Sequence, residues 1–437
     1  MRSALFQITT RCASYYLSAK TLTPQHYQIL VDRGWRRSGI ILYKPDLQHS
    51  CCPHYTIRLP VDELKARADQ RKCISRWNRH VLGEQYIKDS AKTQSKPKKV
   101  KGDQDQAPYD LRHAIHEAEF DLLDRPGESD HKFEVTLEKD IFTLEKYKLY
   151  QNYQHNVHHD PMDKITRDGF RRFLCDSPLN RTEPDEVNGV GRKLGSYHQC
   201  YRYDGRLIAL GVLDLLPHCV SGVYFIYHSD FSKWSFGKLS ALREACLALE
   251  GGYQFYYMGY YIHSCPKMRY KNDYSPQYIL DLENFEWSPL DDEFRRLLDG
   301  KKYVSMSLRR QSDENDSLVG HTVDKEARQD SLPGPEINPR RVVFDSAEEA
   351  VDAVRDDLSL FDLNFPGMMT EAELEKTVNL DSIVLALEGD QLVMCQMLVS
   401  WLKSDIRDGS LKSIIAQMVA CIGTEVSKTM VVDFRRS

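Results

Sequence analysis

The clearest hydrophobic pattern lies in the middle of the chain, where apolar residues alternate with polar ones or form short apolar runs. These patterns predict β-strands at 194–203, 207–215, 222–228, 253–258 and 278–282. Apolar positions with helical spacing predict helices at 166–175 and 238–250. Asp204 and Gly205 separate the first two strands, and this pair is typical of a tight hairpin turn. A hairpin followed by a strand-helix-strand unit favours an α+β fold with a mixed sheet.

Two further regions flank this sheet. Residues 21–60 are rich in turns and contain an alternating stretch at 55–58, which predicts a short strand in a small module, and a helical stretch follows at 61–86. The last hundred residues are expected to be mainly helical. Apolar residues there follow helical spacing at Leu392, Cys395, Leu398, Val399 and Leu402, and again at Leu411, Ile414, Ile415, Met418 and Ile422. These helices either pack on the body of the protein or bind a partner.

Two segments lack the apolar residues that a packed core requires. One, at 88–108, is rich in lysine, and the other, at 311–340, is polar with Gly and Pro. The lysine-rich segment is either a solvated linker or a flexible arm attracted to phosphates. We therefore expect a small N-terminal domain at 1–86, a flexible linker at 87–132, a mixed-sheet domain at 133–303, a disordered linker at 304–341 and a helical region at 342–437.

Composition narrows the class of protein. With 41% hydrophobic and 28% charged residues the chain is expected to be globular, and its net charge of −5 excludes a uniformly basic nucleic-acid binder. No uncharged run approaches the roughly 18 residues of a membrane-spanning helix, so no membrane partner is expected. The eleven cysteines are interpreted as reduced thiols in the cytoplasm, with the nucleus as a second compartment. The stretch 1–31 has no acidic residue, which makes a mitochondrial presequence the alternative.

Three clusters could carry chemistry. The stretch 259–271 combines tyrosines, His263, Cys265 and three cations around a proline. On the first predicted strand, alternation places Tyr197, Gln199 and Tyr201 on one face and His198 and Cys200 on the other. The turn at 34–39 presents two guanidinium groups beside a tryptophan, an arrangement that suits a phosphate, a carboxylate or a stacked base.

These segments, in order and approximate spacing, resemble the arginyl-tRNA:protein arginyltransferase family of eukaryotic type. The similar segments are GWRRSG at 34–39, CCPHYTIR at 51–58, FLCDSPL at 173–179, YHQCY at 197–201 and the stretch 259–271. The resemblance covers about residues 21–300. It implies an enzyme that moves arginine from arginyl-tRNA to proteins that begin with Asp, Glu or oxidised Cys, with a catalytic domain of acetyltransferase-like (GNAT-like) fold.

One feature departs from the family. Its members usually carry a Cys-Gly-Tyr-Cys segment upstream of the cysteine pair, and the four thiolates together resemble a zinc or iron–sulfur site. Here the pair is Cys51 and Cys52, and the upstream segment holds only Cys12. Either the chain is a variant with an alternative start, or His54 or Cys12 completes a different site, or no metal binds.

Residue types suggest the remaining roles. An acidic acceptor residue calls for a cation, and the donor arginine calls for a carboxylate or an aromatic face. We expect catalytic roles for His263, Tyr261 and Gln199, and substrate binding by Lys267, Arg269, Tyr270, Tyr197 and Asp214. Transfer RNA is expected to contact Arg36, Arg37, Arg58, Lys98 and Lys99, and Cys51 and Cys52 would form an incomplete metal site. The expected partners are arginyl-tRNA and proteins with acidic N-termini.

Two alternative functions compete with arginyl transfer. An acyl-CoA N-acetyltransferase would share the implied fold, but its pyrophosphate needs a glycine-rich turn at a helix N-terminus. At the equivalent place, the segment 231–240 has only one glycine among bulky aromatics, so the close approach of a pyrophosphate is expected to be blocked. A non-catalytic variant that recognises acidic N-termini is the second alternative, because the upstream cysteine segment is missing.

Overall fold

The computed structural model describes residues 2–8, 13–93, 109–183, 191–319, 359–388, 391–407 and 409–435. Cys12, Lys98 and Lys99 lie outside these residues, as do most of the lysine-rich segment and of the predicted disordered linker. The first predicted linker, 87–132, begins inside α3 (Glu84–Thr93), and the second, 304–341, begins just before α10 (Met306–Val319). Among the described residues, none of the helices combines the length and apolarity that a membrane crossing requires.

A central mixed sheet confirms the predicted α+β class. Its strands lie in the order β13-β12-β5-β10-β9-β8-β7-β6, and β11 pairs separately with β5. Their bounds are β5 Tyr55–Pro60, β6 Phe133–Lys139, β7 Gly195–Tyr203, β8 Arg206–Leu216, β9 Cys219–Tyr227, β10 Phe255–Tyr257, β11 Tyr260–Tyr261, β12 Tyr278–Leu280 and β13 Trp287–Pro289. All neighbours are antiparallel except β9 and β10. The predicted hairpin joins β7 to β8, with positive φ angles at Asp204 and Gly205.

Strand β5 lies in this central sheet and not in a separate module. It pairs with β10 on one side and β12 on the other, and Tyr55, Ile57 and Leu59 are buried in the main core. The alternating pattern therefore identified the strand, but no local pattern indicates its partners, which lie about two hundred residues further along the chain. Segments 55–60 and 278–289 together extend the sheet beyond β10.

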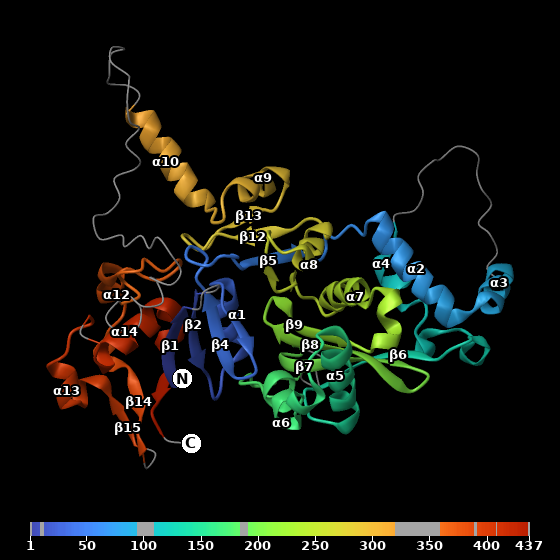
Figure 1. Ribbon diagram of the computed structural model, residues 1–437, viewed down its shortest axis with the longest axis horizontal. Coiled ribbons are helices and arrows are strands. Elements are labelled where there is room, and N and C mark those ends of the chain that lie inside the picture. Colours follow the sequence, from blue (N-terminus) through green and yellow to red (C-terminus); the bar gives the residue numbers. More distant parts are fainter. Residues whose placement is uncertain are drawn as a thin grey trace.

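Helices cover both faces of the central sheet (Figure 1). On one face, α7 (Phe236–Glu250) contacts β9 and β10 and is flanked by α2 (Ala68–Leu82) and α4 (Leu111–His116). On the other face, α5 (Leu144–Val157) contacts β8 and β9, with α6 (Arg167–Phe170) beside it. Helix α7 connects two parallel strands, which is the predicted strand-helix-strand unit. The predicted helix 166–175 continues past α6 as a wider π-helical turn at Arg171–Cys175.

A second body combines the two ends of the chain. The N-terminal sheet has the order β1-β2-β4-β3, with α1 (Pro24–Asp32), and shares one apolar core with the C-terminal region (Figure 1). Its strands are β1 Arg2–Ile8, β2 Ala13–Ser18, β3 Arg36–Ser38 and β4 Ile41–Pro45. The indole Nε1 of buried Trp35 donates to the carbonyl of Cys421 at 3.3 Å. The predicted helical region therefore packs on the body of the protein.

The C-terminal region is less helical than its apolar spacing predicted. It contains a three-stranded sheet of β15 (Leu392–Met394), β14 (Val384–Ala386) and β16 (Val431–Asp433). The first predicted helical stretch is thus strand β15, a 3₁₀ turn at Cys395–Met397 and the short helix α13 (Val399–Leu402), whereas the second is α14 (Leu411–Ile422). The remaining helices are α8 Pro266–Arg269, α9 Asp292–Gly300, α12 Glu371–Thr377, α13 Val399–Leu402 and α15 Thr424–Ser427.

Candidate functional site

The point where β9 and β10 diverge organises the candidate site. Strand β10 pairs with β9 only from Cys219 to Ser221, but β9 continues to Tyr227. Beyond Ser221 the backbone of β9 has no parallel neighbour, and the residues from Gly222 to Phe225 become partly exposed. Ligands of open α/β sheets commonly bind where adjacent strands part, because backbone groups and side chains converge there.

Glu244 extends from α7 toward this point and is buried. The Tyr256 hydroxyl donates to its Oε2 at 2.5 Å. Two strand glycines leave room for the carboxylate: a Cβ at Gly222 would lie 3.2 Å from Oε2, and a Cβ at Gly211 would lie 3.4 Å from Oε1. Burial raises the pKa of Glu244 to about 7, although Tyr256 and Lys271 favour the charged form.

Lys271 supplies the opposite charge. It is buried, and its Nζ donates to the carbonyl of Tyr260 at 2.7 Å. Burial and the positive charge of Arg36 lower the pKa of Lys271 to about 8, while Glu244 acts in the opposite direction. Gly259, with a positive φ of 79°, adopts a backbone conformation that favours glycine, and a Cβ there would lie 3.5 Å from Nζ, at ordinary contact distance. Gln277, also buried, donates to the carbonyl of Lys271 at 3.2 Å.

Gln199 lies next to this pair. Its Oε1 accepts from the Tyr201 hydroxyl at 2.7 Å, and a Cβ at Gly211 would be 3.8 Å from the Gln199 Cβ as well as close to Glu244. The alternation predicted for this strand is confirmed, since Tyr197 and Tyr201 belong to the core beside α7 and Cys200 to the core beside α5. We name Glu244, Lys271, Tyr256, Gln277 and Gln199 the strand-divergence site.

Several buried polar atoms around the strand-divergence site have no hydrogen-bond partner. They include Ser221 Oγ at the last paired residue of β9, Gln277 Oε1, and Nε and Nη2 of Arg36. Unpaired buried polar groups are costly in a folded protein unless a ligand or water satisfies them.

The predicted RNA contacts of Arg36 and Arg37 are not supported, because both side chains are buried. Arg37 forms a two-pronged ion pair with Asp214, with Nε–Oδ2 at 2.8 Å and Nη2–Oδ1 at 2.6 Å. Asp214, predicted to hold the donor arginine, is therefore already occupied. Arg36 donates from Nη1 to the carbonyls of Val31 and Trp35 and lies over the ring of Tyr260.

Arg58 lies on β5 at the other side of β10. Its guanidinium carbon is 4.0 Å from the ring centre of Phe255 and 4.0 Å from that of Trp287. A guanidinium held between two aromatic rings gains cation–π stabilisation and is oriented by the rings. Arg58 is partly exposed, so its predicted contact with RNA stays a prediction.

The predicted catalytic residues Tyr261 and His263 form a hydrogen-bonded chain at the end of β11. The Tyr261 hydroxyl lies 2.7 Å from His263 Nδ1, and Nε2 lies 2.8 Å from Asp299 on α9. Asp299 thereby orients the imidazole. Burial raises the pKa of Tyr261.

The predicted substrate-binding residues are divided between the surface and the sheet. Lys267 and Arg269 lie exposed on α8, and Arg269 Nε donates to the carbonyl of His263 at 2.8 Å. Tyr270 follows directly and is half-buried, and the nearby charge of Glu244 contributes to raising its pKa. Tyr197 lies elsewhere on the sheet, where its hydroxyl donates to Glu183 at 2.9 Å.

Cys51 and Cys52 provide two adjacent thiols but not a complete metal site. Their Sγ atoms are 3.5 Å apart, and a hydrogen bond from Ser264 followed by one from Cys51 lowers the pKa of Cys52. Within the described residues, no third His, Cys, Asp or Glu joins them, and His54 packs edge-on against Tyr260. Zinc and iron–sulfur sites usually need four ligands. The described residues around Cys51 and Cys52 therefore do not complete a site for either group.

Sequence reasoning missed Glu244, Tyr256 and Gln277 as parts of the site. The available signal was a charged pair, Arg243 and Glu244, inside the otherwise apolar run from Leu239 to Leu249. Gly211 and Gly222 gave a second signal, because a glycine within a strand often marks a close approach by another group. Which groups approach could be read only from the packing of α7 on the sheet.

Comparisons with known proteins place these observations in context. The chain matches two family models. The model for the N terminus of arginine-tRNA-protein transferase matches residues 6–72, and the model for the C terminus of the same transferase matches residues 145–281. A solved C-terminal domain of a putative lysylphosphatidylglycerol synthetase from Agrobacterium fabrum aligns over 59% of this chain and 71% of that chain, with 10% identity and a TM-score of 0.26.

Named relatives agree with the family models. Arginyl-tRNA–protein transferase 1 of Saccharomyces cerevisiae is 36% identical over 296 residues, covering 64% of this chain and 53% of that protein, so the chain spans about half of that relative. The Drosophila melanogaster arginyl-tRNA–protein transferase 1 is 30% identical, covering 67% of this chain and 81% of that protein. An aspartate/glutamate leucyltransferase of Pseudomonas fluorescens is 28% identical, and the similarity covers 58% of this chain and 79% of that protein. Since both terminal models match in order and the similarity to the Drosophila protein extends over most of its length, the chain belongs to the arginine-tRNA-protein transferase family.

Proposed function

We propose that this member of the family transfers arginine from arginyl-tRNA to the α-amine of proteins whose first residue is Asp, Glu or oxidised Cys. The observation that carries the proposal is the buried pair of Glu244 and Lys271 at the point where β9 and β10 diverge. Perturbed pKa values at a convergence of buried polar groups are typical of catalytic sites. The β9–α7–β10 unit also supports an acetyltransferase-like arrangement of this domain.

The reaction defines what the residues must do. The acceptor α-ammonium first loses a proton, and the free amine attacks the ester carbonyl of arginyl-tRNA. A carbon–nitrogen bond forms, the carbon–oxygen bond to the terminal ribose breaks, and a proton passes to the leaving ribose oxygen. The net products are an amide, free tRNA and one released proton. Because the ester is already activated, the enzyme needs a base, an oxyanion donor and accurate positioning, but no covalent nucleophile.

Glu244 is proposed as the base. A carboxylate with a pKa of about 7 can accept a proton from the α-ammonium and release it again at neutral pH. The Tyr256 hydroxyl holds the carboxylate, and the two strand glycines leave room for it. Lys271, whose pKa of about 8 leaves it mainly protonated at neutral pH, is proposed to stabilise the oxyanion that forms on the ester carbonyl.

Recognition of the two substrates is proposed for the neighbouring elements. Tyr270 offers an aromatic face to the donor guanidinium, since Asp214 is paired with Arg37 and Asp273 with Arg67. Exposed Lys267 and Arg269 on α8 supply the positive charge that an acidic first residue of the acceptor requires.

The proposal is tested by incubating the purified chain with radiolabelled arginyl-tRNA and matched peptides that differ only in the first residue. We expect label in peptides that begin with Asp or Glu, and at least tenfold less label with Gly. Acetyl-CoA in place of arginyl-tRNA, offered with acceptor peptides, tests the acetyltransferase alternative and should give no transfer. Equal incorporation into the Asp and Gly peptides would refute the proposed acceptor selectivity, and absence of transfer to every peptide would refute the activity.

A further inference from the structure

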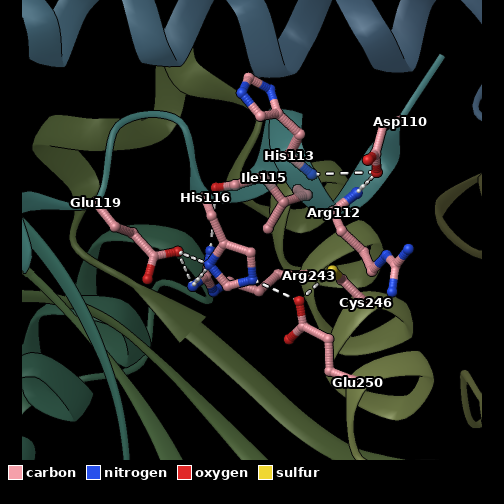
Figure 2. A network of polar contacts seen from close by, with 9 residues as sticks. All are labelled: Asp110, Arg112, His113, Ile115, His116, Glu119, Arg243, Cys246 and Glu250. Atoms are coloured by element: carbon pink, nitrogen blue, oxygen red, sulfur yellow. Dashed lines mark hydrogen bonds and ion pairs between the residues drawn. The ribbon is translucent and has the colours of Figure 1, made fainter. Parts of the chain in front are cut away.

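A second cluster of polar side chains lies at the C-terminal end of α7, the helix that also carries Glu244. It joins His116, the last residue of α4, to Cys246 and Glu250 on α7 (Figure 2). Cys246 and Glu250 are four residues apart, so they lie on the same face of the helix. A histidine, a thiol and a carboxylate are the three ligand types that zinc accepts in proteins.

The spacing of the three ligand atoms suits one small cation. His116 Nε2 lies 2.7 Å from Glu250 Oε1, and Cys246 Sγ lies 3.3 Å from the same oxygen. One ligand atom from each residue lies within 4.8 Å of the other two. Ligands bound tetrahedrally to zinc at about 2.0 to 2.3 Å are separated from one another by roughly 3.4 Å. Small rotations of the three side chains would therefore place them around a common ion.

The imidazole of His116 is oriented as in a metal site. Its second nitrogen, Nδ1, lies 2.7 Å from Glu119 Oε1, and Glu119 is in turn paired with Arg243. Figure 2 shows the ring between Glu119 on one side and Glu250 on the other. Histidines that ligate zinc almost always donate their other ring proton to such an outer acceptor, which fixes the ring and directs the free nitrogen at the ion.

An entry path is present as well. His116 and Glu250 line a cavity of about 780 Å³, together with Asp110 and His113. Cys246 is buried, whereas the Glu250 side chain is 36% exposed, so the cluster connects the interior with this cavity. Three protein ligands with a solvent-facing side leave a fourth position for water.

We propose that His116, Cys246 and Glu250 bind one zinc-class divalent cation, with Glu119 positioning His116. Binding would release the protons of His116 Nε2 and of the Cys246 thiol to solvent. The ion would connect α4 to α7. Because α4 directly follows the lysine-rich segment, the ion would fix the end of that segment to the domain that carries Glu244. This proposal does not depend on the proposed function.

Cobalt(II) titration tests the proposal, because thiolate-bound cobalt has a charge-transfer absorption in the near ultraviolet. The full chain with Cys51→Ser and Cys52→Ser serves as the parent, so that the exposed pair does not contribute. We expect one equivalent of Co²⁺ with that absorption and a tetrahedral visible spectrum, both displaced by Zn²⁺. A parent chain without the thiolate band would overturn the proposal, whatever its variants do.

Variants then assign the ligands. His116→Ala and Cys246→Ala should each lower the Co²⁺ affinity at least tenfold, and Glu119→Gln should lower it about 10- to 100-fold. Cys73→Ala is the matched control, since Cys73 is a buried thiol on α2 outside the cluster, and it should bind as the parent does. Zn²⁺ should raise the melting temperature of the parent and of Cys73→Ala. His116→Ala should still show a melting transition, which demonstrates that it folds. Zn²⁺ should not raise its melting temperature, because the variant lacks the site. Unchanged affinity in both ligand variants would place the ion elsewhere and refute the proposal.

Discussion

Glu244 and Lys271 are two buried charged residues of opposite sign at the point where β9 and β10 diverge. Neither forms a direct ion pair with the other: Glu244 accepts from Tyr256, and Lys271 donates to the carbonyl of Tyr260. Burial moves both pKa values toward neutrality, upward to about 7 for the acid and downward to about 8 for the base. Arg37 and Asp214, in contrast, form a direct two-pronged ion pair, and Arg37 also donates to Gly39 and Ser196, so their geometry is that of a structural pair.

Glu244→Gln tests the proposed base. The amide oxygen can still accept from Tyr256, so the fold should persist, but proton acceptance is lost. We expect kcat/KM to fall by about 10²- to 10⁴-fold. In the parent, kcat/KM should rise with pH as Glu244 ionises near 7, and it should fall again near 8. The fall has two causes: Lys271 loses the proton that stabilises the oxyanion, and the acceptor amine loses the proton that Glu244 removes. In the variant the rise near 7 should be absent, and only the fall near 8 should remain.

Tyr256→Phe is the matched variant for this pH profile. Its hydroxyl lowers the pKa of Glu244, so removing it should move the rise in kcat/KM to higher pH, while the groups that cause the fall near 8 are unchanged. If Glu244→Gln shows the parent's profile and rate, Glu244 has a structural role only.

At the scale of elements, the short helix α8 presents cations beside the strand-divergence site. Pro266 begins the helix, and the backbone carbonyl of His263 holds Arg269 through Nε. Lys267 projects from the same turn. The predicted concentration of chemistry in the stretch 259–271 thus corresponds to three adjacent structures: β11, α8 and the turn that carries Lys271.

Arg269→Ala and Lys267→Ala test acceptor recognition. Each should lower kcat/KM for an Asp-starting peptide at least tenfold, since loss of one partner from a desolvated charge pair costs about 2 to 5 kcal/mol. Arginyl-tRNA binding should be largely kept, as measured by filter binding. Arg296→Ala on α9 is the control, because that arginine is also exposed and bound to a backbone carbonyl through Nε. Normal transfer by both α8 variants would place the acceptor site elsewhere.

At the scale of the whole molecule, the N-terminal sheet and the C-terminal region fold as one body. Lys44 on β4 is buried between them, and its Nζ donates to the carbonyl of Gly367 at 2.8 Å. Burial, followed by the charge of Arg33, lowers the pKa of Lys44 to about 7. An unpaired buried ammonium is costly, so this contact joins the two chain ends at the expense of stability.

Lys44→Met tests the cost of burying the Lys44 ammonium, because that cost makes the stability of the protein depend on pH. Below pH 7 Lys44 is charged in both the folded and the unfolded chain, and the burial cost is fully present. Between pH 7 and about 10.5 the unfolded chain binds more protons than the folded chain, so stability rises with pH. The parent should therefore gain roughly 2 kcal/mol from this residue between pH 7 and pH 9, since one pH unit of unequal proton binding is about 1.4 kcal/mol.

Urea unfolding of the parent and of Lys44→Met at pH 6, 7, 8 and 9 measures the effect. The variant should be at least as stable as the parent at pH 6, and its advantage should shrink toward pH 9. Arg33 also donates to the carbonyl of Gly367, which keeps that acceptor satisfied in the variant. If the free energies of unfolding of the parent and of Lys44→Met change with pH in parallel, the lowered pKa of Lys44 is contradicted.

The sequence by itself determined the local elements. Alternating apolar residues located the strands of the central sheet, and Asp204-Gly205 defined the hairpin, because side-chain period and turn geometry depend on adjacent residues only. Helical spacing located α7 and α14 for the same reason. It misassigned Leu392–Met394, a short strand that pairs with a neighbour through contacts that no local pattern records.

Only the tertiary structure decided which side chains meet. It placed β5 in the central sheet, buried Arg37 against Asp214 across 177 positions of sequence, and brought Glu244 and Lys271 to one point between two diverging strands. The sequence neighbours of a charged residue do not determine whether its side chain is buried or which group it contacts. Their pKa values and partners follow from burial and from groups that are distant in the chain, and these exist only once helices and sheet have packed.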